Sequence, residues 1–229
     1  MKKLAVVVFV FGAAVLSLAY AQKGLGNKAP EGFVITYVTR RATDNANNGR
    51  NELAVRMVGT NGRWKETSWR DTGKTETVSD GTHVYSHSEK KSTLDYVGSL
   101  GLGEGKGEPV SEIPGNASNT GMMLGVKVYS IRNEQSNGSY IETTYSLETG
   151  AQALRIVVYF PGAGEVFTRE AVALQFRPIK DEELAMPDFP INFSKAEREL
   201  EEMRNSGNEV DYLEEGIKAA KAEAAKRQR

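Results

Sequence analysis

Residues 79–91 read SDGTHVYSHSEKK and contain both histidines of the chain, His83 and His87. This segment follows an Asp-Gly turn and is rich in β-branched and aromatic residues, which is typical of a β-strand. On a strand, two residues that are four positions apart lie on one face, about 13 Å from each other. A zinc ion requires each imidazole nitrogen at about 2.1 Å, and the chain has no cysteine and no third histidine. We therefore interpret the segment as one strand of a sheet and predict neither a metal site nor a cofactor.

The pattern of short strands and tight turns continues on both sides of this segment. Asn61-Gly62 is a strong hairpin signal, and Asp71-Thr72-Gly73 and Pro161-Gly162 also predict turns. Strands joined by such turns indicate an antiparallel meander and a mainly β (α+β) fold. The predicted strands include FVITYVTR (33–40), NELAVRMVG (51–59), RWKETSWR (63–70), STLDYVG (92–98), GVKVYSIRN (125–133), YIETTYSLE (140–148), AQALRIVVYF (151–160) and EVFTREAVALQFRPI (165–179).

Two segments depart from this pattern. Residues 97–121 are rich in glycine and predict a long loop that is inserted between strands. After Pro190 the sequence becomes strongly charged, and Ser194 with Glu197 forms an S-x-x-E capping box that predicts the start of a helix. Gly207 is expected to end that helix. A second helix follows, and its apolar residues share one face: Val210, Leu213, Ile217 and Ala220.

The N-terminal segment has the features of a secretory signal peptide. Lys2 and Lys3 precede the apolar run LAVVVFVFGAAVLSL, and Ala19-Tyr20-Ala21 has the small-x-small form that signal peptidase recognises. We predict cleavage after Ala21 and export to the periplasm or out of the cell. The apolar run is shorter than the roughly 20 residues of a membrane-spanning helix. We therefore expect no stable membrane span after cleavage, and an uncleaved N-terminal anchor is the less favoured alternative.

The predicted organisation thus has three parts: the signal peptide (1–21), a sheet domain with the glycine-rich insertion (22–193), and a helical extension (194–229). Because an exported chain without cysteine has no disulfides, the sheet domain must be stabilised by its hydrophobic core.

Composition and motifs exclude several classes of function. The net charge of −1 and the absence of a basic cluster argue against nucleic-acid binding. The tripeptide at 71–73 matches that of aspartic proteases but follows Trp69 and Arg70 instead of two apolar residues, and a second copy is missing. The S-x-x-K match at 88–91 ends a strand, and the glycine run at 101–108 lacks the Ser or Thr of a P-loop. We predict no catalytic residue, and an enzyme is the third hypothesis.

Short motifs over residues 33–190 resemble the LolA/LolB-like and RseB-like group of periplasmic proteins. They are the D-G-x-x-x-Y step (Asp80, Gly81, Tyr85), the acid-x-Gly turn (Glu148, Gly150) and the closing segment with Pro178, Ile179, Asp181 and Pro187. The resemblance implies a strongly curved antiparallel sheet, a half-barrel of about 8–11 strands, here with C-terminal helices. It also implies that an acyl chain or another hydrophobic group binds on the concave face. The lipoprotein carriers of that group close the cavity with helical lids between strands, whereas here the insertion reads as a loop.

The resemblance suggests a non-enzymatic binding protein, whose ligand is a hydrophobic group or a lipidated protein. The alternative is a cell-envelope interaction module with a self-filled core and a partner surface on the C-terminal helices. The candidate residues lining the concave face are the alternating apolar sets and the tryptophans: Leu53, Val55, Met57, Trp64, Trp69, Leu154, Ile156, Val158, Val172, Leu174 and Phe176. For any single one of them, ordinary core packed on the C-terminal helix is the favoured interpretation.

Overall fold

The structure is a computed structural model that describes residues 32–41, 52–59, 62–99, 113–149, 152–207 and 210–227. The predicted signal peptide (1–21) and residues 100–112 of the predicted loop lie outside these ranges. The first strands are β1 (Gly32–Arg41), β2 (Glu52–Gly59), β3 (Trp64–Arg70), β4 (Gly73–Ser79), β5 (His83–Ser88) and β6 (Leu94–Ser99). The second group is β7 (Asn119–Met123), β8 (Val126–Glu134), β9 (Tyr140–Ser146), β10 (Gln152–Phe160) and β11 (Gly164–Phe176). The chain continues through the 3-10 helix η2 (Asp181–Leu184), β12 (Ile191–Asn192), α2 (Ser194–Asn205) and α3 (Asp211–Arg227).

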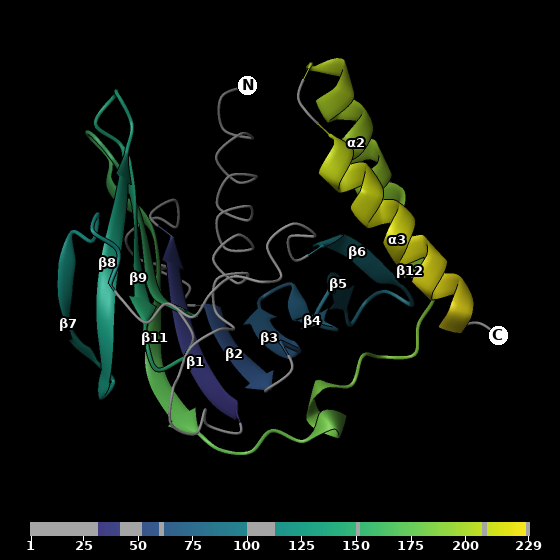
Figure 1. Cartoon of the computed structure of the whole chain (residues 1–229), viewed down its shortest axis with the longest axis horizontal. Helices are drawn as coiled ribbons and strands as arrows, with labels where there is room; N and C mark the ends of the chain where they lie inside the picture. The colour runs from purple at the N-terminus through teal and green to yellow at the C-terminus, as the bar shows by residue number, and fades with distance from the viewer. Residues whose placement is uncertain are drawn as a thin grey trace.

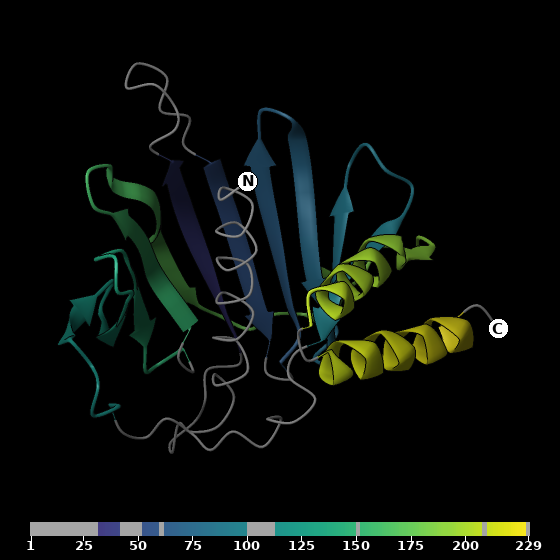
Figure 2. The ribbon, with the colours of Figure 1, turned by 90° about the horizontal axis from the view of Figure 1, so that it is seen from above.

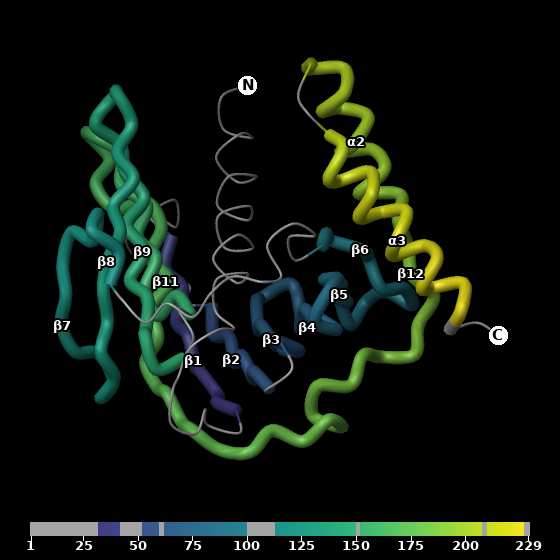
Figure 3. The backbone as a smooth tube through the Cα atoms, viewed as in Figure 1, coloured from purple at the N-terminus to yellow at the C-terminus, as the bar shows by residue number. Residues whose placement is uncertain are grey.

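All the described strands belong to one sheet, in the order β12-β6-β5-β4-β3-β2-β1-β11-β10-β9-β8-β7. Strand β1 pairs antiparallel with both β2 and β11, so it joins two meanders into a single surface. Strand β12 pairs with β6 in parallel. The sheet does not close on itself, and its curved form is visible in Figures 1 and 3. The predicted α+β class, a curved antiparallel sheet followed by C-terminal helices, is confirmed.

The sheet has 12 strands in the described part of the chain, slightly more than the predicted 8–11. The difference comes from β12, which has only two residues, and from β7, which lies partly inside the segment that was predicted to be loop. Residues 97–99 of that segment likewise belong to β6. Among the described helices, none combines the length and the apolar character that a membrane crossing requires.

Contacts between distant strands show which face of the sheet is concave. Glu66 on β3 bonds to Arg169 on β11, and Arg56 on β2 bonds to Gln152 on β10. In each pair the strands are three spacings apart in the sheet order, about 14 Å if the sheet were flat. Only the face toward which the sheet bends brings such side chains together, so we call the face that carries Arg56 and Glu66 the concave face.

The concave face carries the larger of two hydrophobic clusters. This concave cluster contains buried side chains from both meanders, and no helix residue belongs to it: Phe33, Ile35, Tyr37, Ala54, Val58, Trp64, Val84, Val126, Val128, Leu154 and Ala171. Met123 and Leu174 pack against it at its margin. The core of the protein is therefore built across the join between the two meanders.

The second cluster, the helix cluster, lies on the opposite face of β5 and β6, under α2 and α3 (Figure 2). It contains Tyr85, Leu94, Tyr96, Ala196, Leu200, Val210, Ile217 and Ala220. Neighbouring residues on β5 mark the division, because Val84 belongs to the concave cluster and Tyr85 to the helix cluster. None of the candidate lining residues belongs to the helix cluster, so they are not packed on the C-terminal helices.

Both histidines lie on β5, as predicted, and both have packing roles there. His83 is buried, and its Nδ1 lies 3.1 Å from Ser99 Oγ. The ring of His87 stacks on Phe189 with a centroid distance of 4.6 Å. No group of three potential metal ligands occurs within the described ranges.

The helix ends differ in part from the prediction. Ser194 is the first residue of α2 and makes no capping bond, since Phe193 is the N-cap residue and has no side-chain hydrogen bond to the helix. The predicted capping box is therefore wrong. Asn192 Oδ1 instead accepts a hydrogen bond from the Ser194 N–H at 3.1 Å. Gly207 follows the end of α2 with φ 72°, as expected of a residue that ends a helix.

Helix α3 approaches β6 closely at Gly216. A Cβ at this position would lie 2.6 Å from Ser99 Oγ and 3.2 Å from Tyr96 Oη. Ser99 cannot turn away without cost, because its Oγ is within hydrogen-bond distance of both His83 Nδ1 and Tyr96 Oη. The absence of a side chain at Gly216 thus sets the distance between the helix and the sheet.

We expect Gly216→Ala to lower the unfolding temperature by about 5 °C, although alanine favours a helix more than glycine does, because the added methyl group overpacks the contact with Ser99. Thermal unfolding followed by circular dichroism measures the shift. The control is Lys218→Ala, an exposed residue on the same helix, which should leave the temperature unchanged. An unfolding temperature raised by Gly216→Ala would contradict the close packing of α3.

Candidate functional site on the concave face

Three charged residues occupy the middle of the concave face: Arg56 on β2, Glu66 on β3 and Arg169 on β11. We call them the Arg–Glu–Arg cluster. Arg56 and Glu66 are direct cross-strand partners, and Arg169 lies opposite Thr39 of β1. Because cross-strand partners point to the same face, the register alone places all three side chains toward the interior of the curve.

Glu66 receives hydrogen bonds from both arginines. Arg56 donates from Nε to Glu66 Oε2 at 2.7 Å, and Arg169 donates from Nη1 to Oε1 at 3.0 Å and from Nη2 to Oε2 at 2.6 Å. The Arg169 pair is bidentate, the strong form of an arginine–carboxylate contact. The cluster therefore ties β2, β3 and β11 together across the concave face.

These contacts determine the protonation of the carboxyl group. Burial by itself raises the pKa of Glu66, but the charges of Arg56 and Arg169 and their hydrogen bonds outweigh it and lower the pKa to about 2. Burial lowers the pKa of Arg169, whereas Glu66 raises it, and the net direction is upward. Glu66 and Arg169 are therefore both ionised at neutral pH. Two cations share one carboxylate, so the cluster carries a net positive charge.

An aromatic ring supports each arginine. The Arg169 guanidinium lies 4.1 Å from the Tyr37 ring centroid, and that of Arg56 lies 4.6 Å from the Trp64 ring centroid. The Tyr37 hydroxyl donates to the carbonyl of Ala153 on β10 at 2.9 Å. The indole Nε1 of Trp64 is buried, and no acceptor among the described residues lies within hydrogen-bond distance of it. The site thus contains one buried donor without an acceptor in the described ranges.

Six of the candidate lining residues belong to the concave cluster or lie on the concave face near it. Trp64 and Leu154 are members of the concave cluster, and Leu174 packs against it. Ile156 lies opposite Arg169 and Val158 opposite Phe167, which places them on the same face as the arginine. Phe176 lies opposite Phe33, and their rings meet edge to face at 6.2 Å. Whether these residues hold a ligand stays a prediction.

The other candidates are wrongly placed by the sequence pattern. Strand β2 alternates Leu53, Val55 and Met57 with Ala54, Arg56 and Val58, and the register puts the second set on the concave face. The first set lies on the convex face, together with Trp69, which is the cross-strand partner of Leu53. Val172 falls where the β1–β11 register shifts, and half of its surface is exposed. The more apolar set of a strand is not always the buried one.

The Arg–Glu–Arg cluster was not found by sequence reasoning, because arginine and glutamate in strands ordinarily mark a solvated face. One signal was present in the sequence. Arg56 lies between Ala54 and Val58 on its face of β2, and a charged residue in a row of small apolar ones indicates a buried ion pair when a partner of opposite charge lies on the next strand.

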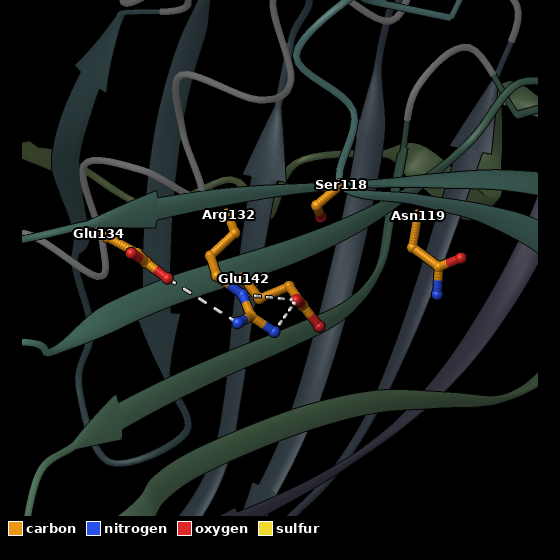
Figure 4. A pocket seen from close by; sticks show the side chains of 5 residues that line it. All are labelled: Ser118, Asn119, Arg132, Glu134 and Glu142. Carbon is orange, nitrogen blue, oxygen red and sulfur yellow. Dashed lines mark hydrogen bonds and ion pairs between the residues drawn. The ribbon is translucent and has the colours of Figure 1, made fainter.

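Two cavities lie away from the concave cluster. One of about 640 Å³ is lined by Ser118, Asn119, Arg132, Glu134 and Glu142, and its charges are already paired, with Arg132 Nη2 at 2.7 Å from Glu142 Oε2 (Figure 4). The other, of about 390 Å³, lies between the end of β4, the segment around η2 and α3. Both are polar in character and neither is lined by the Arg–Glu–Arg cluster.

No protein-family model matches the chain, and no curated protein matches it significantly. Solved structures do match. An uncharacterized conserved protein from Thermus thermophilus has 10% identity and a TM-score of 0.49, and the match covers 80% of this chain and 99% of that one. The MucA/MucB complex of Pseudomonas aeruginosa matches with 15% identity and a TM-score of 0.42, covering 76% of this chain and 59% of that one. The LolA superfamily protein NE2245 from Nitrosomonas europaea matches with 10% identity and a TM-score of 0.38, covering 76% and 97%.

Replacing Glu66 with glutamine should strongly destabilise the protein, because two buried cations lose their common counter-ion. The Glu66 pKa of about 2, against an ordinary 4.5, corresponds to about 3 kcal/mol of stability. Since the folded pKa lies below the unfolded one, this contribution is complete above about pH 4.5 and is lost as the pH falls toward 2. Urea unfolding between pH 7 and pH 3 should therefore show a pH dependence that is weaker in Glu66→Gln.

The matched control for this prediction is Glu183→Gln. Glu183 also has a pKa of about 2, held down by hydrogen bonds from Arg177, but about one third of each side chain is exposed, 34% and 31%. Exposed ion pairs contribute little, so this variant should unfold nearly as the parent does. If the two substitutions lowered the free energy of unfolding equally, the buried cluster would contribute no more to stability than the Arg177–Glu183 pair.

Proposed function

We propose that this protein is an exported, non-enzymatic binding protein that holds a hydrophobic group, such as an acyl chain, on the concave face of its sheet. One observation supports this most strongly: the concave cluster is built from sheet residues alone, while α2 and α3 pack on the opposite face of β5 and β6. A curved apolar face on which neither α2 nor α3 packs suits a ligand or a lipidated partner.

The margin of the concave face is the natural place of entry for such a ligand. The centre is closely packed, and Ile35 and Tyr37 are buried. Toward the end of β11, by contrast, Leu174 is only partly buried and Phe176 is 42% exposed. An alkyl chain lying along these side chains would lose its contact with water, which stabilises the complex by about 0.8 kcal/mol for each buried methylene.

The chemistry of the concave face supports binding without catalysis. Glu66 is the carboxylate at its centre, and a pKa of about 2 leaves it unable to take up a proton near neutral pH. A general base requires a pKa near the working pH and a free approach to the substrate. Both oxygens of Glu66 are instead committed to Arg56 and Arg169.

A matched pair of substitutions tests the location of the site. Phe176 on the concave face and Leu53 on the convex face are 42% and 43% exposed. We expect Phe176→Glu to weaken the binding of the neutral probe N-phenyl-1-naphthylamine by about tenfold, because it puts a charge beside the apolar probe. Leu53→Glu should leave the affinity unchanged. Probe fluorescence with purified protein measures both, and equal losses would place the binding site elsewhere.

A second candidate function is docking of an envelope protein on the C-terminal helices. Their inner faces are committed to the helix cluster, and ion pairs from Arg204 to Glu214 and from Lys221 to Glu197 link the two helices. The outer surface is densely charged and includes Tyr212, which is 66% exposed. This surface has the charged and aromatic character of a polar protein interface.

Removing residues 194–229 separates the two candidates. The deletion uncovers Tyr85, Leu94 and Tyr96, so we expect a lower unfolding temperature. The concave cluster contains no residue of the helices, and the strand signal in circular dichroism and the binding of the neutral probe should therefore persist. Capture of an envelope partner, if the second candidate holds, should be lost. Complete unfolding of the truncated chain would show that the helices are part of the core.

A further inference from the structure

We propose that Arg56, Arg169 and Trp64 form a subsite for an anionic head group, a carboxylate or a phosphate, at the end of the hydrophobic chain held on the concave face. This inference rests on the proposed function, because it assigns the polar end of the same ligand. It is carried by three observations on the described residues: an uncompensated charge, unused donors, and an apolar surface beside them.

The charge comes from the composition of the cluster. Two guanidinium groups face one carboxylate, and Glu66 is the acid to which both arginines bond in the described part of the chain. The charge of Glu52 also acts on Arg169, but Glu52 forms its ion pairs with Arg41 and Arg70. A buried cation without a counter-ion is unfavourable, and proteins usually avoid it unless something neutralises the charge. A bound oxyanion would complete the pairing, giving two cations and two anions.

The donors point to the same conclusion. Arg56 uses both Nε and Nη2 on Glu66 Oε2, whereas its Nη1 makes only a long contact of 3.4 Å to Gln152 Oε1. The Trp64 ring stacks against this guanidinium, and the residue is only 3% exposed. Its indole N–H makes no hydrogen bond within the described ranges. Both oxygens of Glu66 are occupied, so an acceptor brought in by a ligand is what the site lacks.

Access and surroundings fit an amphiphile better than a free ion. Arg169 keeps 20% of its side-chain surface accessible, so a ligand can reach the cluster. Ile156 is its direct cross-strand partner, and the buried Leu154 lies two residues further along the same strand. A head group at the arginines would therefore have apolar side chains of β10 beside it for the first part of an alkyl chain.

The experiment compares ligands that differ only in the head group. Dodecanoate, dodecyl phosphate and dodecanol are used to displace N-phenyl-1-naphthylamine from the full-length purified protein at neutral pH. We expect the two anions to bind about tenfold or more tightly than the alcohol, as charge-assisted hydrogen bonds predict. The two anionic compounds distinguish carboxylate from phosphate recognition.

Arg169→Met should abolish this preference, measured as the ratio of the affinities for dodecanoate and dodecanol, because the remaining Arg56 and Glu66 neutralise each other. The control is Arg155→Met, which removes a half-buried arginine from the neighbouring strand, where it pairs with Glu142 and Glu165 instead of Glu66. The preference should persist in this control. Equal affinity for acid and alcohol in the parent protein, or equal effects of both variants, would overturn the head-group subsite.

A second readout leaves the cluster untouched, which matters if Arg169→Met fails to fold. The chain has two tryptophans, and Trp69 lies half exposed on the convex face. In Trp69→Phe, Trp64 is the remaining tryptophan, and dodecanoate should shift its emission to longer wavelength by accepting the indole hydrogen bond. Binding of dodecanoate without any emission change would refute the role of Trp64. If none of the three compounds displaces the probe, the proposed function itself fails.

Discussion

The bonds that Glu66 makes to Arg56 and Arg169 are the interaction on which the rest of the structure depends. They join β2, β3 and β11, which belong to two meanders whose backbones are paired through β1. Side chains on β3 and β11 meet only if the sheet bends strongly toward them, so the cluster and the curvature require each other. A buried ion pair is a poor source of net stability because of its desolvation cost. Its contribution here is geometric, since it fixes which face of the sheet is concave.

The curvature gives the two faces of the sheet different roles. On the concave side, the apolar side chains converge on the charged cluster and form one core across the join of the meanders. On the convex side, β5 and β6 are covered by α2 and α3, which pack through small and apolar residues, and α3 lies close to β6 at Gly216. The helices therefore stabilise one end of the sheet without filling its interior. The proposed ligand site and the proposed partner surface are consequently independent of each other.

Much of this architecture follows from local patterns in the sequence. The alternation and the turns define the strands, the strand around His83 and His87 excludes a metal clamp, and the apolar face of α3 is buried where Val210, Ile217 and Ala220 predict it. The candidate site was less accessible to such reasoning. Alternation on β2 yields two sets of residues but does not say which faces inward, and the more apolar set is the outer one. The choice is made by long-range pairing, since Arg56 and Glu66 must face Arg169. Register shifts near Val172 and Leu154 also depend on neighbouring strands and have no local signal.

Native mass spectrometry of the protein purified from the cell envelope tests the central claim most directly, with solvent extraction of the same sample to identify what is released. A protein that holds a hydrophobic chain on its concave face should carry a bound amphiphile, with an acidic head group, and lose it on extraction. A ligand-free mass, together with failure of the purified protein to take up a neutral apolar probe, would contradict the account.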